Sequence, residues 1–260
     1  MWEATSISHR SRAPERPSWP GCPPVMKTDL SAENKGAYVQ GMFNRIAPRY
    51  DLMNRLMTGG QDLRWRREVI HRARLGPNAH LLDLGAGTGD LAREALRQHP
   101  DCHALAADFT LGMMRVGQRH APPAPDWSAA DALALPFASQ YFDAIVSGYL
   151  LRNVSDLQLA LKEQLRALKP GGWLVSLDTT RPVRSILTPF IQFHMRMIIP
   201  LLGSLLTGQR DAYTYLPSSS ENFLDAETLA EALRAAGFEE VGFQRRMFGT
   251  MAIHWGRRPA

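Results

Sequence analysis

Residues 81–90 read Leu81-Leu82-Asp83-Leu84-Gly85-Ala86-Gly87-Thr88-Gly89-Asp90. The apolar first half predicts a buried strand, and the three glycines after it predict a tight turn that opens a helix near Asp90. Glycines let the backbone approach a ligand without a Cβ atom in the way. The helix start adds free N–H groups at its positive end. The stretch therefore predicts a nucleotide-binding turn between a strand and a helix of an α/β fold.

The spacing of the glycines narrows the choice of nucleotide. A dinucleotide fingerprint has the pattern G-x-G-x-x-G, whereas here the third glycine comes one residue early. Asp83 lies two residues before Gly85, where a carboxylate would repel a diphosphate and attract a cationic amino group. The pattern G-x-G-x-G preceded by this Asp is typical of S-adenosylmethionine sites. We therefore expect Asp83, Gly85 and Gly87 to bind S-adenosylmethionine.

Three segments follow the turn at the spacing of alternating strands and helices. Asp108 ends the apolar run 104–107, where a carboxylate can bind both ribose hydroxyls. Asp131-Ala132 precedes a further apolar strand, and an acid there would accept a hydrogen bond from the adenine amine. Residues 168–175 predict a helix end, a Pro-Gly-Gly turn and a fifth strand. Together these features predict a class I S-adenosylmethionine-dependent methyltransferase fold, which is Rossmann-like, with a seven-stranded, mostly parallel sheet and helices on both faces.

Composition fits one such domain and excludes several classes. The chain has 260 residues, 45% of them hydrophobic, which is enough to bury one core. Its two cysteines, Cys22 and Cys102, stand apart from other metal ligands, so we expect no disulfide framework, no metal and a cytoplasmic location. The net charge of +5 comes from residues 1–75, which hold 13 Lys/Arg against 7 Asp/Glu. The rest is nearly neutral and lacks an Asn/Asp-Pro-Pro-aromatic motif, so we expect no nucleic-acid partner.

Composition separates an N-terminal tail from residues 31–260, which we expect to form a single methyltransferase domain containing two distinct parts, a cap and an insertion. Residues 1–30, rich in Ser, Pro and Arg, predict a disordered tail or a stretch ahead of the true start codon. Apolar residues at helical spacing, broken at Pro48, predict a helical cap at 31–75. We expect residues 183–222 to form a hydrophobic insertion on the substrate side. Because prolines and polar residues interrupt it, we do not expect it to span a membrane.

Two of these parts each leave two interpretations open. The arginines of the cap favour either solvent-exposed helix faces or attraction to an anionic membrane surface. The apolar insertion either covers an apolar substrate or lies at the bilayer edge, or it forms a core or dimer helix.

Three motifs resemble the ubiquinone/menaquinone biosynthesis C-methyltransferase family, and the similarity runs from about residue 36 to 257. The motifs are Phe43-Asn44-Arg45-Ile46-Ala47-Pro48-Arg49-Tyr50-Asp51-Leu52-Met53-Asn54, Leu151-Arg152-Asn153-Val154-Ser155-Asp156 and Tyr213-Thr214-Tyr215-Leu216-Pro217-Ser218-Ser219-Ser220. The resemblance implies that Thr88, Asp108 and the pair Asp131-Ala132 contact S-adenosylmethionine. A family serine falls on Gly148, which we place at the cofactor site.

Two stretches depart from the family pattern. Tyr149-Leu150 stands where the family has Phe-Gly, and residues 178–180, Asp-Thr-Thr, replace its Glu-Phe-Ser. Both stretches follow predicted strands, at the mouth of the site. The departures therefore bear on the identity of the acceptor more than on the type of reaction.

The chemistry of methyl transfer suggests which residues act on the acceptor. The protein must hold the acceptor carbon in line with the S–CH3 bond and make it nucleophilic. A phenol at pH 7 is short of its anion by roughly 3 pKa units, or about 4 kcal/mol. We expect Arg152 to stabilise a phenolate and Asn153 to position the same oxygen. Tyr50, His194 and His254 are the candidate proton acceptors. A structural ion pair is the alternative role for Arg152.

The resemblance implies a polyprenylated quinol as the substrate, methylated on its ring. An enzyme for such a substrate would be cytoplasmic with peripheral contact at the inner face of the cell membrane, and a homodimer is compatible with it. Two alternatives stay open. One is the same enzyme class acting on another lipid-like or secondary-metabolite acceptor, and the other is a protein that binds S-adenosylmethionine without turnover.

Overall fold

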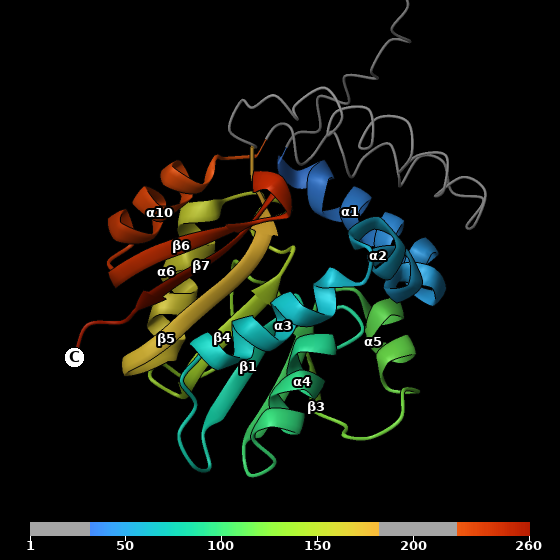
Figure 1. Ribbon diagram of the computed structural model, residues 1–260, viewed down its shortest axis with the longest axis horizontal. Coiled ribbons are helices and arrows are strands. Elements are labelled where there is room, and N and C mark those ends of the chain that lie inside the picture. The colour runs from blue at the N-terminus through green and yellow to red at the C-terminus, as the bar shows by residue number, and fades with distance from the viewer. Residues whose placement is uncertain (1–31, 182–222) are drawn as a thin grey trace, which may run out of the picture.

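The computed structural model describes residues 32–181 and 223–260. The predicted tail, the predicted insertion and His194 therefore lie outside the described residues. Seven strands form one sheet in the order β3-β2-β1-β4-β5-β7-β6 (Figure 1). The strands are β1 His80–Leu84, β2 His103–Asp108, β3 Asp126–Ala129, β4 Phe142–Gly148, β5 Leu168–Thr179, β6 Glu239–Arg246 and β7 Met251–Arg257.

The sheet is parallel except at one end. Strands β1 to β5 pair in parallel, whereas β7 runs antiparallel between β5 and β6. The predicted seven-stranded, mostly parallel sheet is confirmed. Because the parallel strands all point the same way, the turns that follow them gather at one edge of the sheet, where ligands bind in open α/β folds.

Helices cover both faces of the sheet. They are α1 Ala32–Ile46, α2 Tyr50–Thr58, α3 Gln61–Arg72, α4 Asp90–Gln98, α5 Leu111–Gly117, α6 Leu157–Ala167 and α10 Ala226–Ala235, with 3-10 turns at Ala47–Arg49 and Met247–Gly249. Successive residues of a strand point to opposite faces, so both faces of a fully covered strand are apolar. Leu81 packs with α3 and α4, while Leu82 packs on the other side.

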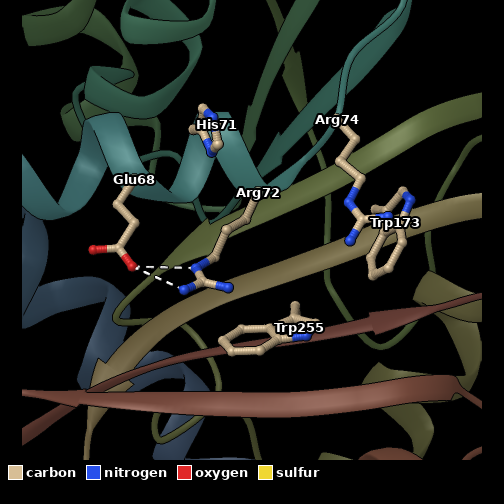
Figure 2. Close-up of a pocket in the computed structure, with 6 residues that line it drawn as sticks. All are labelled: Glu68, His71, Arg72, Arg74, Trp173 and Trp255. Atoms are coloured by element: carbon tan, nitrogen blue, oxygen red, sulfur yellow. Dashed lines mark hydrogen bonds and ion pairs between the residues drawn. The ribbon is translucent and has the colours of Figure 1, made fainter.

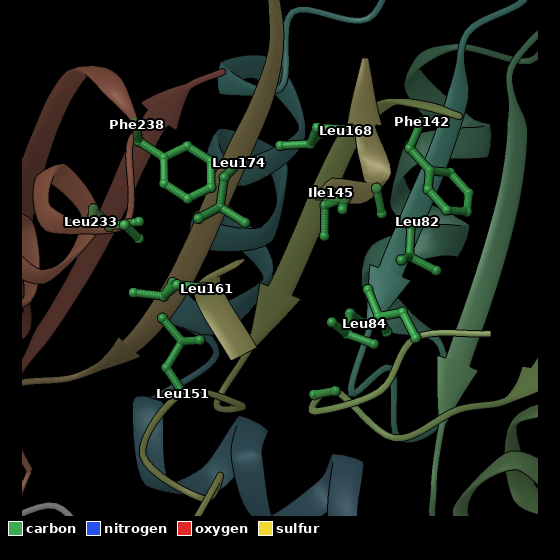
Figure 3. Close-up of a cluster of buried hydrophobic side chains, with 14 of the residues drawn as sticks. Leu82, Leu84, Phe142, Ile145, Leu151, Leu161, Leu168, Leu174, Leu233 and Phe238 are labelled. Atoms are coloured by element: carbon green, nitrogen blue, oxygen red, sulfur yellow. The ribbon is translucent and has the colours of Figure 1, made fainter. Parts of the chain in front are cut away.

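Figure 3 shows the second of these two cores. Strand residues Ile145 and Leu174 meet Leu161 of α6 and Leu233 of α10, and all four are buried. A leucine truncated to alanine in such a core costs about 2–5 kcal/mol of unfolding free energy. This packing fixes the positions of the strands whose ends build the site.

Two local predictions from the sequence have different outcomes: one is confirmed and the other is wrong. The chain breaks as expected around Pro48, where α1 ends at Ile46 and a 3-10 turn leads into α2. The predicted Pro-Gly-Gly turn is wrong as a separate element, because β5 begins directly after α6. The register passes from Phe142–Leu168 to Ala144–Trp173, so the extra residues bulge within the strand.

Three helices, α1 to α3, occupy the stretch expected to form a cap (Figure 1). The boundaries assigned to tail, cap and insertion stay predictions. Every helix within residues 32–181 and 223–260 is too short or too polar to traverse a lipid bilayer.

Candidate active site

The glycine turn connects β1 to α4 at the carboxyl edge of the sheet. Gly85, Gly87 and Gly89 have φ angles of +66°, +58° and +80°, a region that side chains with a Cβ rarely adopt. The Gly85 N–H donates to the Ala107 carbonyl at 2.8 Å, which ties the turn to the end of β2. A Cβ on Gly85 would lie 2.8 Å from Leu150 Cδ1. Both the conformation and the close packing therefore require glycine here.

A partly open pocket lies against this turn. It is lined by Tyr50, Arg66, Asp83, Gly85, Ala86, Gly87, Thr88, Asp90, Leu91, Gly148, Tyr149 and Leu177. The structure thus brings together six predicted site residues, namely Tyr50, Asp83, Gly85, Gly87, Thr88 and Gly148. The other predicted residues, Asp108, Asp131, Ala132, Arg152 and Asn153, lie outside this lining.

Asp83 has an incomplete set of hydrogen bonds. Its side chain is buried, and Oδ2 accepts the Ala92 N–H at 2.9 Å. Oδ1 has no hydrogen-bond partner among the described residues. Burial raises the pKa of Asp83 to about 7, against the lowering effects of the Ala92 N–H and of Arg66. A buried polar atom without a partner is costly, so a cationic group with N–H donors fits this wall of the pocket.

Asp108 sits behind the turn at the end of β2. Its Oδ2 accepts the Gly87 N–H and its Oδ1 accepts the Thr110 N–H, each at 2.7 Å. Burial raises the pKa of Asp108, and the backbone N–H groups of Thr110 and Gly87 oppose that rise. Each carboxylate oxygen has a second lone pair, so both can accept a further hydrogen bond from a ribose hydroxyl.

Asp131 and Ala132 lie beyond β3. Asp131 is exposed, and its Oδ1 accepts the Leu133 N–H at 2.9 Å. Ala132 is buried in the core beside α6. Their roles toward adenine stay predictions.

The cap is tied to the glycine turn by side-chain contacts. The Thr88 hydroxyl donates to Asp51 Oδ1 of α2 at 2.7 Å. Arg66 of α3 forms an ion pair with Asp90, the first residue of α4. These contacts place α2 and α3 over the cofactor pocket and explain why Tyr50 lines it.

Asp51, Asp90 and His120 bring their ligand atoms within 4.8 Å of one another, a spacing suited to a metal ion. Arginines already surround this group. Asp90 pairs with Arg66, and His120 Nδ1 lies 2.7 Å from Arg93 Nη2. The cluster is therefore compensated by protein cations.

Arg152 is held by a buried carboxylate. Its Nη1 donates to Asp178 Oδ1 at 2.7 Å, and its backbone N–H donates to Asp178 Oδ2 at 3.2 Å. Both side chains are almost fully buried. The guanidinium carbon lies 5.0 Å from the ring centroid of Tyr149, which lines the cofactor pocket. Arg152 therefore forms a structural ion pair, which was the alternative to a role in catalysis. This ion pair lies next to the pocket through Tyr149.

The neighbouring hydroxyl and amide groups are oriented by the fold. Burial raises the pKa of Tyr50 and that of Tyr149, so both phenols keep their protons at neutral pH and are able to donate a hydrogen bond. Asn153 Nδ2 donates to the Tyr149 carbonyl at 2.8 Å. Buried His254 contacts the Ala226 carbonyl through Nε2 at 2.9 Å, and burial lowers its pKa. None of these contacts tests the predicted roles in proton transfer.

Sequence reasoning missed the partner of Arg152 and the ion pairs of the cap. A signal for Asp178 was present, because it lies at the carboxyl end of a buried apolar run just as Asp108 does. The contact between Arg66 and Asp90 had no such signal, since a pairing across separate elements depends on how they pack.

The sheet order, the glycine turn and the buried Asp83 beside it define a class I methyltransferase fold. Solved structures agree at the level of the fold. The [4+2]-cyclase SpnF matches with a TM-score of 0.62 at 20% identity, over 85% of this chain and 95% of its own. A phosphoethanolamine N-methyltransferase of Haemonchus contortus, solved with S-adenosylhomocysteine, matches with a TM-score of 0.60 at 14% identity, over 89% and 61%.

The chain belongs to the ubiE/COQ5 methyltransferase family, whose pattern matches residues 30–258. It is 46% identical to a ubiquinone/menaquinone biosynthesis C-methyltransferase of Desulfotalea psychrophila, over 86% of this chain and 91% of the relative. It is 41% identical to a demethylmenaquinone methyltransferase of Thermus thermophilus, over 84% and 100%. The chain is therefore an S-adenosylmethionine-dependent methyltransferase, as the sequence motifs predicted.

Proposed function

We propose that the chain methylates a ring carbon of a polyprenylated quinol, converting demethylmenaquinol to menaquinol in respiratory quinone biosynthesis. Relatives that cover most of the chain carry this activity in their names. The observation that carries the proposal is the buried Arg152–Asp178 pair beside the cofactor pocket. A fixed cation at that place suits an acceptor that reacts as an anion.

The residues around the glycine turn fit S-adenosylmethionine, whose sulfonium supplies an electrophilic methyl group when the cofactor is bound. Asp83 Oδ1 would receive the amino group, since it is buried and lacks a partner. Gly85 and Gly87 would let the backbone lie close to the cofactor. Asp108 would accept from the ribose, and Asp131 with Ala132 would contact the adenine.

Arg152 would act on the acceptor by stabilising the phenolate. Asp178 holds the guanidinium in place, so its orientation is set before the substrate enters. Asn153 would help to position the same oxygen. Tyr50 and Tyr149 keep their protons, so each offers an O–H donor at the pocket wall. Together these groups favour the ionised quinol, which carries electron density onto the ring carbon that accepts the methyl.

The direct test uses purified protein, methyl-labelled S-adenosylmethionine and demethylmenaquinol with a short prenyl chain. We expect label in the ring of the reduced acceptor and none in the oxidised quinone, because only the quinol ionises to a phenolate. Equal labelling of both forms would contradict the phenolate mechanism. Labelling of another lipid-like phenol in preference to every quinol would replace the proposed acceptor.

We also propose peripheral contact with a membrane, because a prenyl tail resides in the bilayer. Leu52 and Leu56 lie one turn apart on α2 and are 52% and 43% exposed. Arg45 and Arg49 nearby are exposed as well. An apolar helical ridge flanked by arginines suits the surface of an anionic membrane.

Co-sedimentation with vesicles of phosphatidylglycerol and phosphatidylcholine tests this contact. Leu56→Asp should release the protein from the vesicles. Leu159→Asp is the matched control, because Leu159 is 42% exposed on α6, away from the cap. Equal binding by both variants would contradict a docking role for the cap.

A further inference from the structure

A second groove lies on the α3 side of the sheet, apart from the cofactor pocket. It has a volume of about 280 Å³ and is lined by Glu68, His71, Arg72, Arg74, Trp173 and Trp255 (Figure 2). None of these residues lines the cofactor pocket. The groove therefore belongs to a different surface from the methyl-transfer site.

Two arginine–tryptophan stacks flank the groove. Trp255 on β7 pairs in register with Val175 on β5, so Trp255 and Trp173 are diagonal neighbours on one face of the sheet. The guanidinium carbon of Arg72 lies 3.9 Å from the Trp255 ring centroid, and that of Arg74 lies 4.2 Å from the Trp173 ring. In Figure 2 the Arg72 side chain extends from the end of α3, and that of Arg74 extends from the segment that follows the helix, each toward one of the two indoles.

The two guanidinium groups differ in their hydrogen bonds. Stacking uses the flat face of a guanidinium and leaves its in-plane N–H groups able to donate. Arg72 directs Nε to Glu68 at 3.2 Å and Nη2 to Gln244 at 2.6 Å. For Arg74, neither a hydrogen-bond acceptor nor an ion-pair partner is found among residues 32–181 and 223–260. Its donors therefore face the groove unused by these parts of the chain.

The one carboxylate of the groove does not cancel this positive charge. Glu68 is bound by Arg246 as well as by Arg72. Although burial acts to raise it, these two arginines hold the pKa of Glu68 below its ordinary value. Arg72 and Arg246 thus share this carboxylate, and Arg74 adds a further cation that has no carboxylate of its own among the described residues, which leaves the groove with a net positive charge.

We propose that this groove binds a small aromatic anion, a planar ring that carries a carboxylate or a phosphate. The ring would contact the apolar surface of Trp173 and Trp255 that the stacked guanidinium groups of Arg72 and Arg74 leave open to the groove. The anionic group would accept hydrogen bonds from Arg74, whose planar fork matches both carboxylate and phosphate. The ligand needs both parts, because the ring contacts the tryptophans and the anionic group contacts Arg74.

The test follows the indole N–H signals of the full chain by ¹⁵N NMR, with S-adenosylhomocysteine saturating the cofactor pocket. Probes are 2-naphthoate and 2-naphthyl phosphate, with 2-naphthamide and cyclohexanecarboxylate as controls that lack the charge or the aromatic ring. We expect saturable shifts of the Trp173 and Trp255 signals with the aromatic anions and much weaker effects with both controls. The stronger of the two anions identifies the acidic group.

Arg74→Ala tests the anchor, because Arg74 is exposed and its loss should leave the fold intact. We expect this variant to weaken binding of the aromatic anion roughly tenfold or more. Arg67→Ala, which removes an exposed arginine of α3 that does not line the groove, should bind as the parent does.

Three outcomes would overturn the proposal. One is the absence of saturable shifts, and another is equal binding by Arg74→Ala and the parent. The third is a shift of the two indoles with protein concentration and no probe, which would assign the groove to contact between copies of the chain. All three leave the proposed methyl transfer untouched, since the groove shares no residue with that site.

Discussion

Asp83 and Asp178 are two buried carboxylates at the ends of β1 and β5, and the protein surrounds them differently. Asp178 receives the Arg152 guanidinium and two backbone N–H groups, those of Arg152 and Thr179. Asp83 receives one backbone N–H and keeps one oxygen without a partner among the described residues. The fold thus completes Asp178 by itself and leaves Asp83 to be completed by a ligand. A carboxylate of the first kind supports the structure, and one of the second kind indicates a binding site.

Among the tests that distinguish Asp178 from Asp83, we expect Asp178→Ala to have the largest effect, a loss of unfolding free energy. This change leaves the Arg152 guanidinium buried without its carboxylate, which typically costs about 3–5 kcal/mol of unfolding free energy. Chemical denaturation measures it. Asp143→Ala is the control, because the Asp143–Lys169 pair is 35% and 39% exposed and contributes at most about 1 kcal/mol. Equal losses of unfolding free energy in Asp178→Ala and Asp143→Ala would show that the buried ion pair stabilises the fold no more than the exposed pair does.

Arg152→Lys should separate support of the fold from catalysis at the same pair. Lysine keeps a charge for Asp178, so we expect most of the stability to remain. Turnover should fall about 10²-fold or more, because a point charge does not reproduce a planar contact with a phenolate. The deficit should shrink as pH approaches the acceptor's own pKa, since solvent then supplies the anion. A deficit that stays flat between about pH 7 and 10 would argue against this role of Arg152.

Asp108→Ala should weaken S-adenosylmethionine binding by about 2 kcal/mol, because two ribose hydroxyls lose a charged acceptor. Isothermal titration measures the affinity. Asp108 also accepts the Gly87 N–H, so the melting temperature must be followed in parallel. Unchanged affinity in a folded variant would remove Asp108 from the ribose site and leave it a role in fixing the glycine turn.

The sequence predicted the fold and the cofactor turn because both depend on local signals. Three glycines after an apolar strand, and an acid at the end of the next strand, are readable without knowing how elements pack. The structure confirms the sheet that these signals imply, and it gathers Asp83, Gly85, Gly87 and Thr88 around one pocket.

The features that were not predicted from the sequence depend on packing between elements that are distant in the chain. Asp178 meets Arg152 only because β5 lies beside β4 in the sheet. The groove beside Trp173 and Trp255 forms because β7 pairs with β5. This pairing brings Trp255 of β7 and Trp173 of β5 to the same face of the sheet, near the end of α3. The Pro-Gly-Gly turn failed as a separate element because Leu168 already pairs with Phe142 of β4, so residues 169–172, which have no β4 partner, bulge within β5.

Asp83 has a pH dependence with a definite sign. Burial raises its pKa from 3.8 to about 7. Without cofactor, the folded chain therefore holds a proton on Asp83 that the unfolded chain releases. Because the folded state binds more protons between about pH 4 and 7, the contribution of Asp83 to the unfolding free energy falls as pH rises through that window. A cofactor that binds the ionised form must displace this proton.

Proton release on S-adenosylmethionine binding tests the central claim most directly. It is obtained by isothermal titration at pH 6 in buffers of different ionisation enthalpy, for the parent and for Asp83→Asn. We predict that the parent releases about one proton more per cofactor than the variant, because Asp83 is largely protonated at that pH before binding. Equal release by the two proteins would contradict the account, because Asp83 would then not be the carboxylate that the cofactor completes.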